Sequence, residues 1–493
     1  MGKYICKLCG YLVDVDNLSD AYVCPMCGAK EFEERDETTS SNALDAIIDS
    51  IVDEALEVRI DKIINDREQD KRVRISDNNH AIGRISEKCI KCGQCKKTCE
   101  NIANIRYDLN KCKEPICIGC GQCILNCPTG AMIPKYSFRD VKDIINSNEE
   151  IVIALVSPAV RVSIGECFNI EAGVNVENKL VTALKKVGFD YVFDTAFGAD
   201  LTILEEVAEF AARLTNKGPI PQFTSCCPAW VKYAEIYHPE LLNNLSTCKS
   251  PIGMQCAIIK SYFCEQRGID SSKVVTVAIT REYTPNIDYV ITASEVGILL
   301  KEEDINLPNL SDTPFDKMLG ESSGSGVLFG NSGGVCESAI RTLYRIMTKH
   351  NMKKDELVFD ELRGFEGIKE ATVLIGKYKL RVAVVQQMEN LEKLLENDYY
   401  KKFHFIEVMN CKGGCIGGGG QPLCAIPKLD KIREERSKGI SSIDVNRAVR
   451  FAHDNKELKI LYKEFLKKPL SEKSFKLLHT SYSDKSNLLH DKE

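Results

Sequence analysis

The chain has 493 residues, 44% of them hydrophobic, which is enough for about three or four domains and a sizeable core. The net charge of −6 gives no electrostatic support for nucleic-acid binding. We see no amino-terminal signal segment, no apolar run of the length that a membrane span needs and no disulfide framework among the 23 cysteines. These features predict a soluble cytoplasmic protein in a reducing compartment.

Residues 1–35 contain two Cys-x-x-Cys-Gly turns, formed by Cys6 with Cys9 and by Cys24 with Cys27. Four thiolates that converge tetrahedrally suit either iron or zinc. The pattern resembles rubredoxin. Two interpretations stay open, namely a one-electron iron site and a zinc site that only holds the fold. Residues 36–77 follow as a predicted helical linker, which packs on a neighbour or binds a partner.

Residues 78–145 contain two further cysteine runs with spacings of three, three and four residues. The first run is Cys89, Cys92, Cys95 and Cys99, and the second is Cys117, Cys120, Cys123 and Cys127. This spacing is typical of the bacterial ferredoxin with two [4Fe–4S] clusters, in which the fourth cysteine of each run serves the other cluster. We therefore expect an α+β module that carries single electrons to a redox centre further along the chain.

Residues 146–425 alternate between apolar runs rich in β-formers and helical patterns, which favours parallel α/β layers. The expected strands are Ile151–Val156, Tyr191–Phe193, Val274–Ile279, Tyr289–Thr292, Val382–Val385 and Phe403–Met409. The expected helices include Leu201–Leu214 and Ser338–Met347.

Two segments of this domain carry candidate metal-binding cysteines. Cys411 and Cys415 follow the strand that ends at Met409, and the glycines around them allow positive φ angles and close approach to a bulky cluster. Cys226 and Cys227 precede Pro228, which suits the first turn of a helix. Because a helix N-terminus lowers the pKa of a thiol, this position favours thiolate.

Three segments resemble the conserved segments of iron-only ([FeFe]) hydrogenases. They are TSCCPAW at 224–230, STCKSP at 246–251 and FIEVMNCKGGCIGGGGQP at 405–422. The resemblance covers roughly residues 80 to 482. It implies a catalytic domain of two lobes with mixed and parallel sheets over 146–425, followed by a helical extension like the family's small subunit over 426–493.

The resemblance also implies a cofactor and a role for individual residues. The family's H-cluster is a [4Fe–4S] cubane joined through a cysteine to a two-iron unit with CO, cyanide and azadithiolate. Cys227, Cys411 and Cys415 match cubane ligands, with Cys415 as the bridge, and Met409 matches a residue beside the two-iron unit. Cys226, Glu206, Ser246 and Glu209 match the proton relay. The alternative for Glu206 and Glu209 is an exposed helix face.

One departure from the family follows Thr280. A Pro-Cys-x-Ala-Lys-x-x-Glu segment is expected there, but Thr280 continues directly into Arg281, and no cysteine lies between Cys264 and Cys336. The fourth cubane ligand and a lysine that contacts cyanide are therefore missing. A natural three-thiolate variant, a deletion and a defective sequence are the three interpretations, and we favour a deletion. Nothing in the sequence supports Cys248, Cys256 or Cys264 as a substitute.

The resemblance predicts an enzyme that interconverts protons and electrons with H2. Its expected partners are ferredoxin or a similar electron carrier and the proteins that mature the H-cluster. A non-catalytic gas or redox sensor and an iron–sulfur carrier on the same scaffold are the alternatives. The relay residues favour turnover, whereas the missing segment argues against it.

Overall fold

The computed structural model describes residues 2–6, 12–15, 32–34, 72–76, 78–105, 115–280, 287–353, 356–376 and 378–489. In the first three of these ranges, β1 (Gly2–Cys6) pairs antiparallel with β2 (Leu12–Val15) and β3 (Phe32–Glu34). Three of the four cysteines predicted to bind a metal in this module lie outside the described ranges, as do residues 281–286 and the predicted helical linker apart from residues 72–76, which are not helical.

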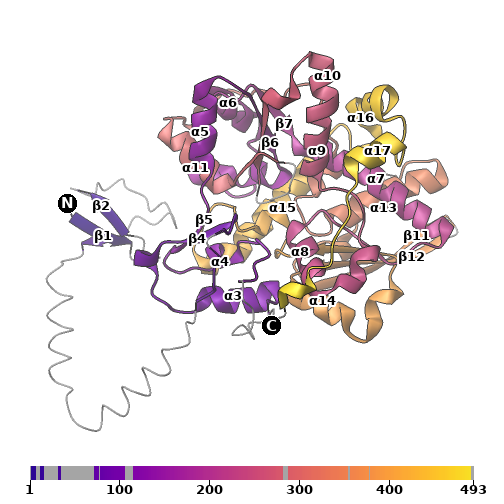
Figure 1. Ribbon diagram of the computed structural model, residues 1–493, viewed down its shortest axis with the longest axis horizontal. Coiled ribbons are helices and arrows are strands. Elements are labelled where there is room, and N and C mark those ends of the chain that lie inside the picture. The colour runs from indigo at the N-terminus through magenta and orange to yellow at the C-terminus, as the bar shows by residue number, and fades with distance from the viewer. Residues whose placement is uncertain are drawn as a thin grey trace, which may run out of the picture.

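The segment with eight cysteines is built on a short antiparallel pair, β4 (Ile82–Arg84) with β5 (Met132–Pro134). Two helices, α3 (Gln94–Ala103) and α4 (Gln122–Leu125), each begin after a glycine with positive φ. Helix α3 carries two of the cysteines and α4 carries one. A small apolar cluster between them and the strands buries two of those cysteines, Cys95 and Cys123. In Figure 1 this segment lies along one side of the larger body, where α3 contacts α14 (Met388–Leu395).

The first large sheet has the order β10–β9–β6–β7, and all its strands are parallel. The strands are β6 (Ile151–Val156), β7 (Tyr191–Asp194), β9 (Val274–Ile279) and β10 (Tyr289–Ile291). Both faces are covered, because alternate residues of one strand point to opposite sides. Val152, Ala154 and Val156 pack with α5 (Phe138–Ser147), α6 (Glu177–Val187) and α11 (Ala293–Glu302).

The other face of this sheet is closed by α9 (Pro251–Ile258), the helical segment through α10 (Cys264–Arg267), and two carboxy-terminal helices. These are α16 (Lys456–Leu461) and α17 (Glu472–Leu478). Leu478 of α17 is fully buried there, so α17 is part of the core of the first lobe.

The second sheet has the order β11–β12–β13–β8 and is mixed. Its strands are β8 (Gln222–Phe223), β11 (Ile368–Ile375), β12 (Tyr378–Gln386) and β13 (Phe405–Met409). Only β11 runs antiparallel, to β12. Helices α8 (Pro228–Tyr237) and α14 cover one face, and α7 (Thr195–Asn216) and α13 (Gly334–Thr348) cover the other.

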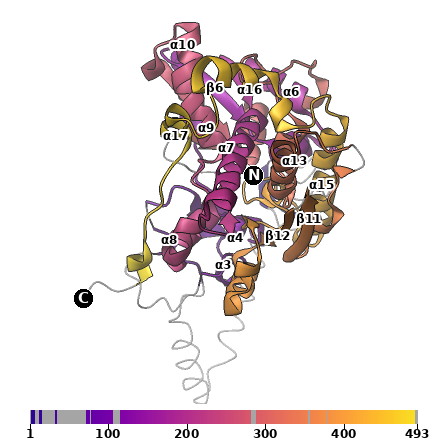
Figure 2. The same cartoon turned by 90° about the vertical axis from the view of Figure 1, so that its right-hand side faces the viewer.

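Helix α7 runs through the middle of the molecule, with α9 and α17 on one side and α13 on the other (Figure 2). It packs against α9, α12 (Gly324–Leu328) and α13, and so joins the two lobes. The side chain of Asp194 caps its first turn by accepting a hydrogen bond from the Ala196 amide at 2.8 Å. A rigid helix buried on several sides can present ionisable side chains to the interior.

Most of the predicted strands and helices agree with the structure. Strands β6 and β9 have the predicted bounds, and β7 and β10 differ by one residue. Strand β13 is two residues shorter than predicted, and the prediction covers only the second half of β12. The two predicted helices lie inside α7 and α13. The expected two lobes with mixed and parallel sheets are confirmed, because the first sheet is parallel and the second is mixed. The antiparallel strand β11 itself was not among the predicted strands. Within the described ranges, no helix is both long enough and apolar enough to cross a bilayer.

Candidate functional site

The candidate site lies at the carboxyl ends of parallel strands. Cys226 and Cys227 follow β8, Cys411 follows β13, and β8 and β13 are neighbours in the second sheet. Because parallel strands end at the same sheet edge, the two cysteine segments are brought together there. The Thr224 amide donates to the Ile406 carbonyl at 3.0 Å, and the Thr224 hydroxyl accepts from the Val408 amide at 3.2 Å.

The thiols in this region are close enough to influence one another electrostatically. Cys227 and Cys415 both raise the pKa of Cys226, and Cys227 also raises the pKa of Cys411. Cys227 is the N-cap residue of α8, and Pro228 occupies its first turn as predicted. The structure therefore gathers Cys226, Cys227, Cys411 and Cys415 into one site.

The loop from Cys411 to Gln421 is held in place by both lobes. Gly413 and Gly414 have φ angles of 83° and 86°, and a Cβ at Gly414 would lie 2.5 Å from the Ser332 amide nitrogen. The loop therefore requires glycine at these two positions. At its far end the Gln421 side chain donates to the Cys415 carbonyl at 3.0 Å and accepts from the Ser163 hydroxyl at 2.5 Å.

The second cysteine run lies directly against this loop. The side-chain amide of Gln122 donates to the Cys411 sulfur at 3.2 Å and to the Gly417 carbonyl at 2.9 Å. A Cβ at Gly419 would lie 2.4 Å from the backbone of Gly121. The absence of a side chain at Gly419 therefore lets the loop come into backbone contact with the neighbouring cysteine module.

Some of the predicted ferredoxin-type cysteines lie near the glycine-rich loop, and others lie in the outer part of the module. Cys99 and Cys120 pack against the apolar cluster that Cys227 also contacts, and Cys120 raises the pKa of Cys411. A second small cluster contains or contacts Cys95, Cys99, Cys117, Cys123 and Cys127. Cys89 is half-buried and Cys92 is exposed. One end of the module therefore faces the candidate site and the other faces outward.

The prediction that a helix N-terminus favours thiolate is wrong for Cys226. Its pKa is raised well above the ordinary value, first by burial and then by the nearby carboxyl groups of Glu206 and Glu407. Loss of solvation outweighs the helix terminus, so this thiol keeps its proton at neutral pH.

Glu206 lies on α7 with only 1% of its surface exposed. Burial, together with the negative charges of Glu209 and Glu407, raises its pKa to about 8, and a hydrogen bond from Ser246 opposes this shift. Its Oε1 atom has no hydrogen-bond partner among the described residues. The alternative of an exposed helix face is therefore wrong for Glu206, which holds a proton at neutral pH beside Cys226.

Glu209 lies one turn further along α7, closer to the surface, with 12% of its side chain exposed. Its carboxylate accepts from the Ser246 hydroxyl at 3.3 Å, from the Thr247 amide at 3.0 Å and from the Arg213 guanidinium at 2.6 Å. Ser246 therefore lies between the two carboxyl groups. The row begins at the buried Glu206, whose pKa Ser246 lowers, and continues through the hydrogen bond from Ser246 to Glu209 to the half-buried Glu209–Arg213 ion pair.

Sequence reasoning missed one polar group of the site. Asn410 lies between the buried Met409 and Cys411 and is fully buried, yet neither atom of its amide has a partner within the described ranges. Two unsatisfied polar atoms beside thiols that are predicted to bind a metal fit a bound polar group at this position. The position was recognisable, because Asn410 directly precedes the predicted ligand Cys411.

The structure contains no substitute for the missing fourth ligand among the thiols proposed for that role. Cys256 and Cys264 are buried in the apolar cluster around α9, and the Cys248 thiol instead donates to Glu209 at 4.0 Å. Residues 280–288 connect two parallel neighbours, β9 and β10, although such connections usually need about a dozen residues or more. The donor set therefore fits the family's cubane at three of its four ligand positions.

Comparisons with known proteins agree with this site. Residues 150–419 match the iron-only hydrogenase large subunit, C-terminal domain, and residues 430–485 match the iron hydrogenase small subunit. The chain is 37% identical to iron hydrogenase 1 of Clostridium pasteurianum, over 84% of this chain and 78% of that protein. It is 36% identical to an NADP-reducing hydrogenase subunit of Solidesulfovibrio fructosivorans, over 84% and 76%.

More distant relatives include a cytosolic Fe–S cluster assembly factor of Danio rerio, 28% identical over 70% of this chain and 89% of that protein. Among solved structures, an [FeFe]-hydrogenase from Chlamydomonas reinhardtii is 34% identical and superposes with a TM-score of 0.62, over 70% of this chain and 98% of that one. The chain therefore belongs to the iron-only ([FeFe]) hydrogenase family.

Proposed function

We propose that this chain is an oxidoreductase that interconverts protons and electrons with H2. The observation that carries the proposal is the juxtaposition of two features, the gathered thiols of Cys227, Cys411 and Cys415 and the buried row from Glu206 to Glu209. A site that only stored or carried an iron–sulfur cluster has no use for a protonated carboxyl group and thiol in its interior.

Within this proposal, Cys227, Cys411 and Cys415 hold the H-cluster, and Met409 and Asn410 line the space beside it. The bound cluster supplies the redox chemistry of hydrogen. The chain's own residues move the protons, because Cys226 and Glu206 keep a proton at neutral pH and Ser246 links Glu206 to Glu209. Proton transfer requires steps of hydrogen-bond length, and the outward step from Ser246 to Glu209, at 3.3 Å, meets this requirement.

The electron route in the proposal uses the module at 78–145. Its eight cysteines hold two [4Fe–4S] clusters, and the one that includes Cys99 and Cys120 faces the H-cluster site. The contact between Gly121 and Gly419 supports this order, since it brings the two segments to backbone contact. A ferredoxin-like carrier in the cytoplasm supplies the electrons, maturation proteins deliver the cluster, and residues 1–35 hold one iron or zinc.

The missing segment after Thr280 limits this activity. A cubane with three protein thiolates leaves one iron open to exchange, and the family's lysine is absent as well. We therefore expect the chain to bind the two-iron unit poorly and to show little or no turnover. A deletion remains the favoured interpretation of the gap, because the short connection from β9 to β10 is unusual for parallel neighbours.

The test is to insert Pro-Cys-Thr-Ala-Lys-Lys-Tyr-Glu after Thr280 and to mature both chains with a synthetic two-iron complex. H2 evolution from reduced viologen should rise from near zero to a measurable rate only with the insertion. A matched insertion with serine in place of the cysteine should remain inactive. Equal, high rates with and without the insertion would show that another residue completes the site.

An iron–sulfur carrier or assembly protein is the second candidate, favoured by the missing ligand and by relatives such as the assembly factor of Danio rerio. A non-catalytic sensor is a third. If the variant with the insertion binds its full iron content and still evolves no H2, the hydrogenase proposal fails. The result would then favour an iron–sulfur carrier or a sensor.

A further inference from the structure

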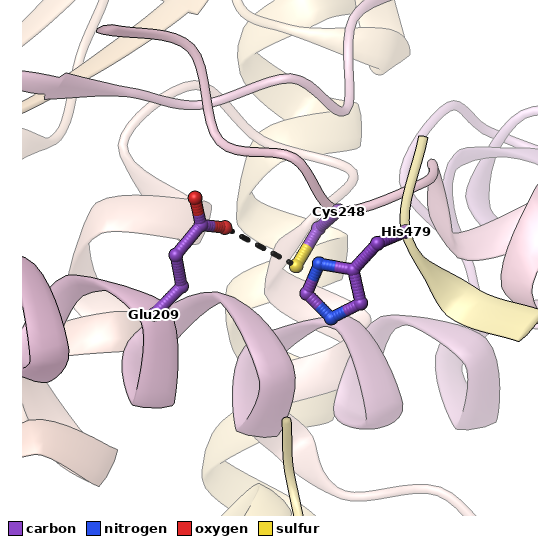
Figure 3. Close-up of side chains that lie close together, drawn as sticks. All are labelled: Glu209, Cys248 and His479. Carbon is purple, nitrogen blue, oxygen red and sulfur yellow. Dashed lines mark hydrogen bonds between the residues drawn. The ribbon is translucent and has the colours of Figure 1, made fainter. Parts of the chain in front are cut away.

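A group of three potential metal ligands lies at the outer end of the Glu206–Glu209 row. Glu209 comes from α7, Cys248 from the segment before α9, and His479 from the residue after α17. One carboxylate oxygen, one sulfur and one ring nitrogen lie within 4.8 Å of one another. Figure 3 shows the sulfur of Cys248 between the Glu209 carboxylate and the His479 ring.

The three side chains are already held near this geometry. Cys248 donates to Oε2 of Glu209 at 4.0 Å. The Thr247 hydroxyl lies 3.1 Å from the same oxygen and 2.7 Å from Nδ1 of His479. The other ring nitrogen, Nε2, lies 3.2 Å from Glu205, so the orientation of the imidazole is fixed from behind, as is common for histidines that bind metals.

Two carboxylates lie beside the Cys248 thiol. Burial is the largest cause that raises the pKa of this thiol, and the negative charges of Glu209 and Glu205 raise it further. Arg213 is the cation that pairs with this group, through Oε1 of Glu209, and it leaves Oε2 on the side of the thiol. A divalent cation beside Oε2 would relieve the repulsion and make loss of the thiol proton favourable.

The donor atoms select the kind of cation. A thiolate, an imidazole and a carboxylate are the ligands of Zn²⁺ in proteins, whereas Mg²⁺ and Ca²⁺ prefer oxygen alone. Tetrahedral Zn²⁺ needs a fourth ligand, and the Thr247 hydroxyl lies close to two of the three donor atoms. Bond lengths of about 2.0–2.3 Å require the three side chains to close by a small distance.

We propose that Glu209, Cys248 and His479 form a binding site for Zn²⁺, and that bound Zn²⁺ inhibits the enzyme by removing Glu209 from the proton route. Binding is a ligand exchange without redox change. Zn²⁺ gains bonds to carboxylate, imidazole and thiolate, and the thiol proton passes to solvent. The inhibition rests on the function proposed above, whereas the binding does not.

The binding test uses the full-length, iron-loaded protein under anaerobic conditions, dialysed against Zn²⁺ and then analysed for zinc and iron. Wild type should retain about one Zn²⁺ per chain more than Cys248→Ser and His479→Gln. Cys264→Ser, which replaces another buried cysteine, should retain as much as wild type. X-ray absorption at the zinc edge should show mixed sulfur and nitrogen or oxygen neighbours in wild type.

Equal zinc in all four proteins, or a zinc edge with sulfur neighbours alone, would overturn the site, because the metal would then lie in the cysteine turns of residues 1–35. Unchanged iron content and tryptophan fluorescence show that the two variants are folded. His479→Asp, which restores a ligand, should recover part of the binding if the folded site is responsible.

The inhibition test measures H2 evolution by the same proteins, carrying the segment inserted after Thr280, as Zn²⁺ is raised and then removed with a chelator. Wild type and Cys264→Ser should be inhibited reversibly, and Cys248→Ser should resist. Zinc binding without inhibition would refute the effect on Glu209. Absence of turnover in every protein would contradict the proposed function, while the dialysis result would still decide the metal site.

Discussion

At the scale of single residues, burial decides which groups of the site carry protons. Cys226 and Glu206 both have raised pKa values, and loss of solvation is the largest cause in each. A thiol and a carboxyl group that stay protonated near neutral pH can each donate a proton inward. The same residues in an exposed position would be less able to do so, because the carboxyl group would be ionised.

The adjacent thiols of Cys226 and Cys227 should respond differently to substitution. In the chain with the inserted segment, Cys226→Ala should lower H2 turnover by about 100-fold or more with iron content unchanged, because one step of the proton route is lost. Cys227→Ala should instead lower the iron content together with activity. Iron analysis beside the H2 assay separates the two effects, and full activity in both variants would refute the assignment.

A half-buried histidine outside the relay makes stability depend on pH. Burial lowers the pKa of His453 to about 4, and its ring nitrogens lie within hydrogen-bond distance of Thr342 and Asn351. The unfolded chain has a pKa near 6.5, so it binds the proton more readily than the folded chain. Stability from this group is present above about pH 6.5 and is lost as the pH falls toward 4.

The variant His453→Gln should remove this dependence. Between pH 7 and pH 5 the unfolding temperature of wild type should fall further than that of the variant, by about 2 °C or more. Thermal scans followed by the fluorescence of Trp230 provide the measurement. Parallel pH curves for the two proteins would show that His453 is not the responsible group.

At the scale of elements, α7 organises the proton-carrying residues. Glu206 and Glu209 are three residues apart and so lie on one face, where Ser246 is located between them. Glu205 points instead to the carboxy-terminal segment, where it accepts hydrogen bonds from Tyr462 at 2.6 Å and from Leu470 at 2.8 Å. The helix therefore connects the relay to the end of the chain.

The contact between the glycine-rich loop and the cysteine module should tolerate no side chain at Gly419. Its Cβ would lie 2.4 Å from the backbone of Gly121, so Gly419→Ala must push the two segments apart. We expect a loss of about 1–3 kcal/mol in unfolding free energy. H2 evolution driven by reduced ferredoxin should also slow more than evolution driven by viologen.

Gly83→Ala is the matched control in the same module, because its Cβ would meet Ile133 at an ordinary 3.5 Å. Denaturant midpoints and the ratio of the two rates are the measurements. If Gly419→Ala behaves like Gly83→Ala, the contact does not hold the module against the site.

At the scale of the whole molecule, two lobes and a cysteine module converge on one loop. The loop from Cys411 to Gln421 contacts the first lobe through Ser163, the second through Ser332, and the module through Gln122. Displacement of any of the three parts therefore alters the surroundings of the candidate site.

The module should hold two clusters in the intact protein. After anaerobic reconstitution, wild type should show EPR signals of two reduced [4Fe–4S] clusters from residues 89–127, since the eight cysteines have the required spacing. Cys120→Ala should lose one of these signals and slow electron delivery while the fold is retained. Iron analysis and EPR of both proteins test this, and wild-type protein without cluster iron would refute it.

Much of the fold was predictable from the sequence, because its elements have strong local patterns. Strands such as Ile151–Val156 are continuous apolar runs, as expected where both faces of a parallel sheet are buried. Strand β11 was missed because its exposed positions interrupt the apolar pattern, and only its pairing with β12 makes it a strand. Such pairing depends on residues that are distant in the chain.

By itself the sequence determined the family and the positions of the cysteines, since ligand spacing within a short segment is fixed by covalent geometry. Only the tertiary structure decided the protonation of Cys226 and Glu206, which depends on the solvent and charge that the fold excludes or supplies. It also brought Glu209, Cys248 and His479 together from three distant segments. No local sequence pattern predicts that these three residues lie together, because the packing of the carboxy-terminal segment against α7 brings them together.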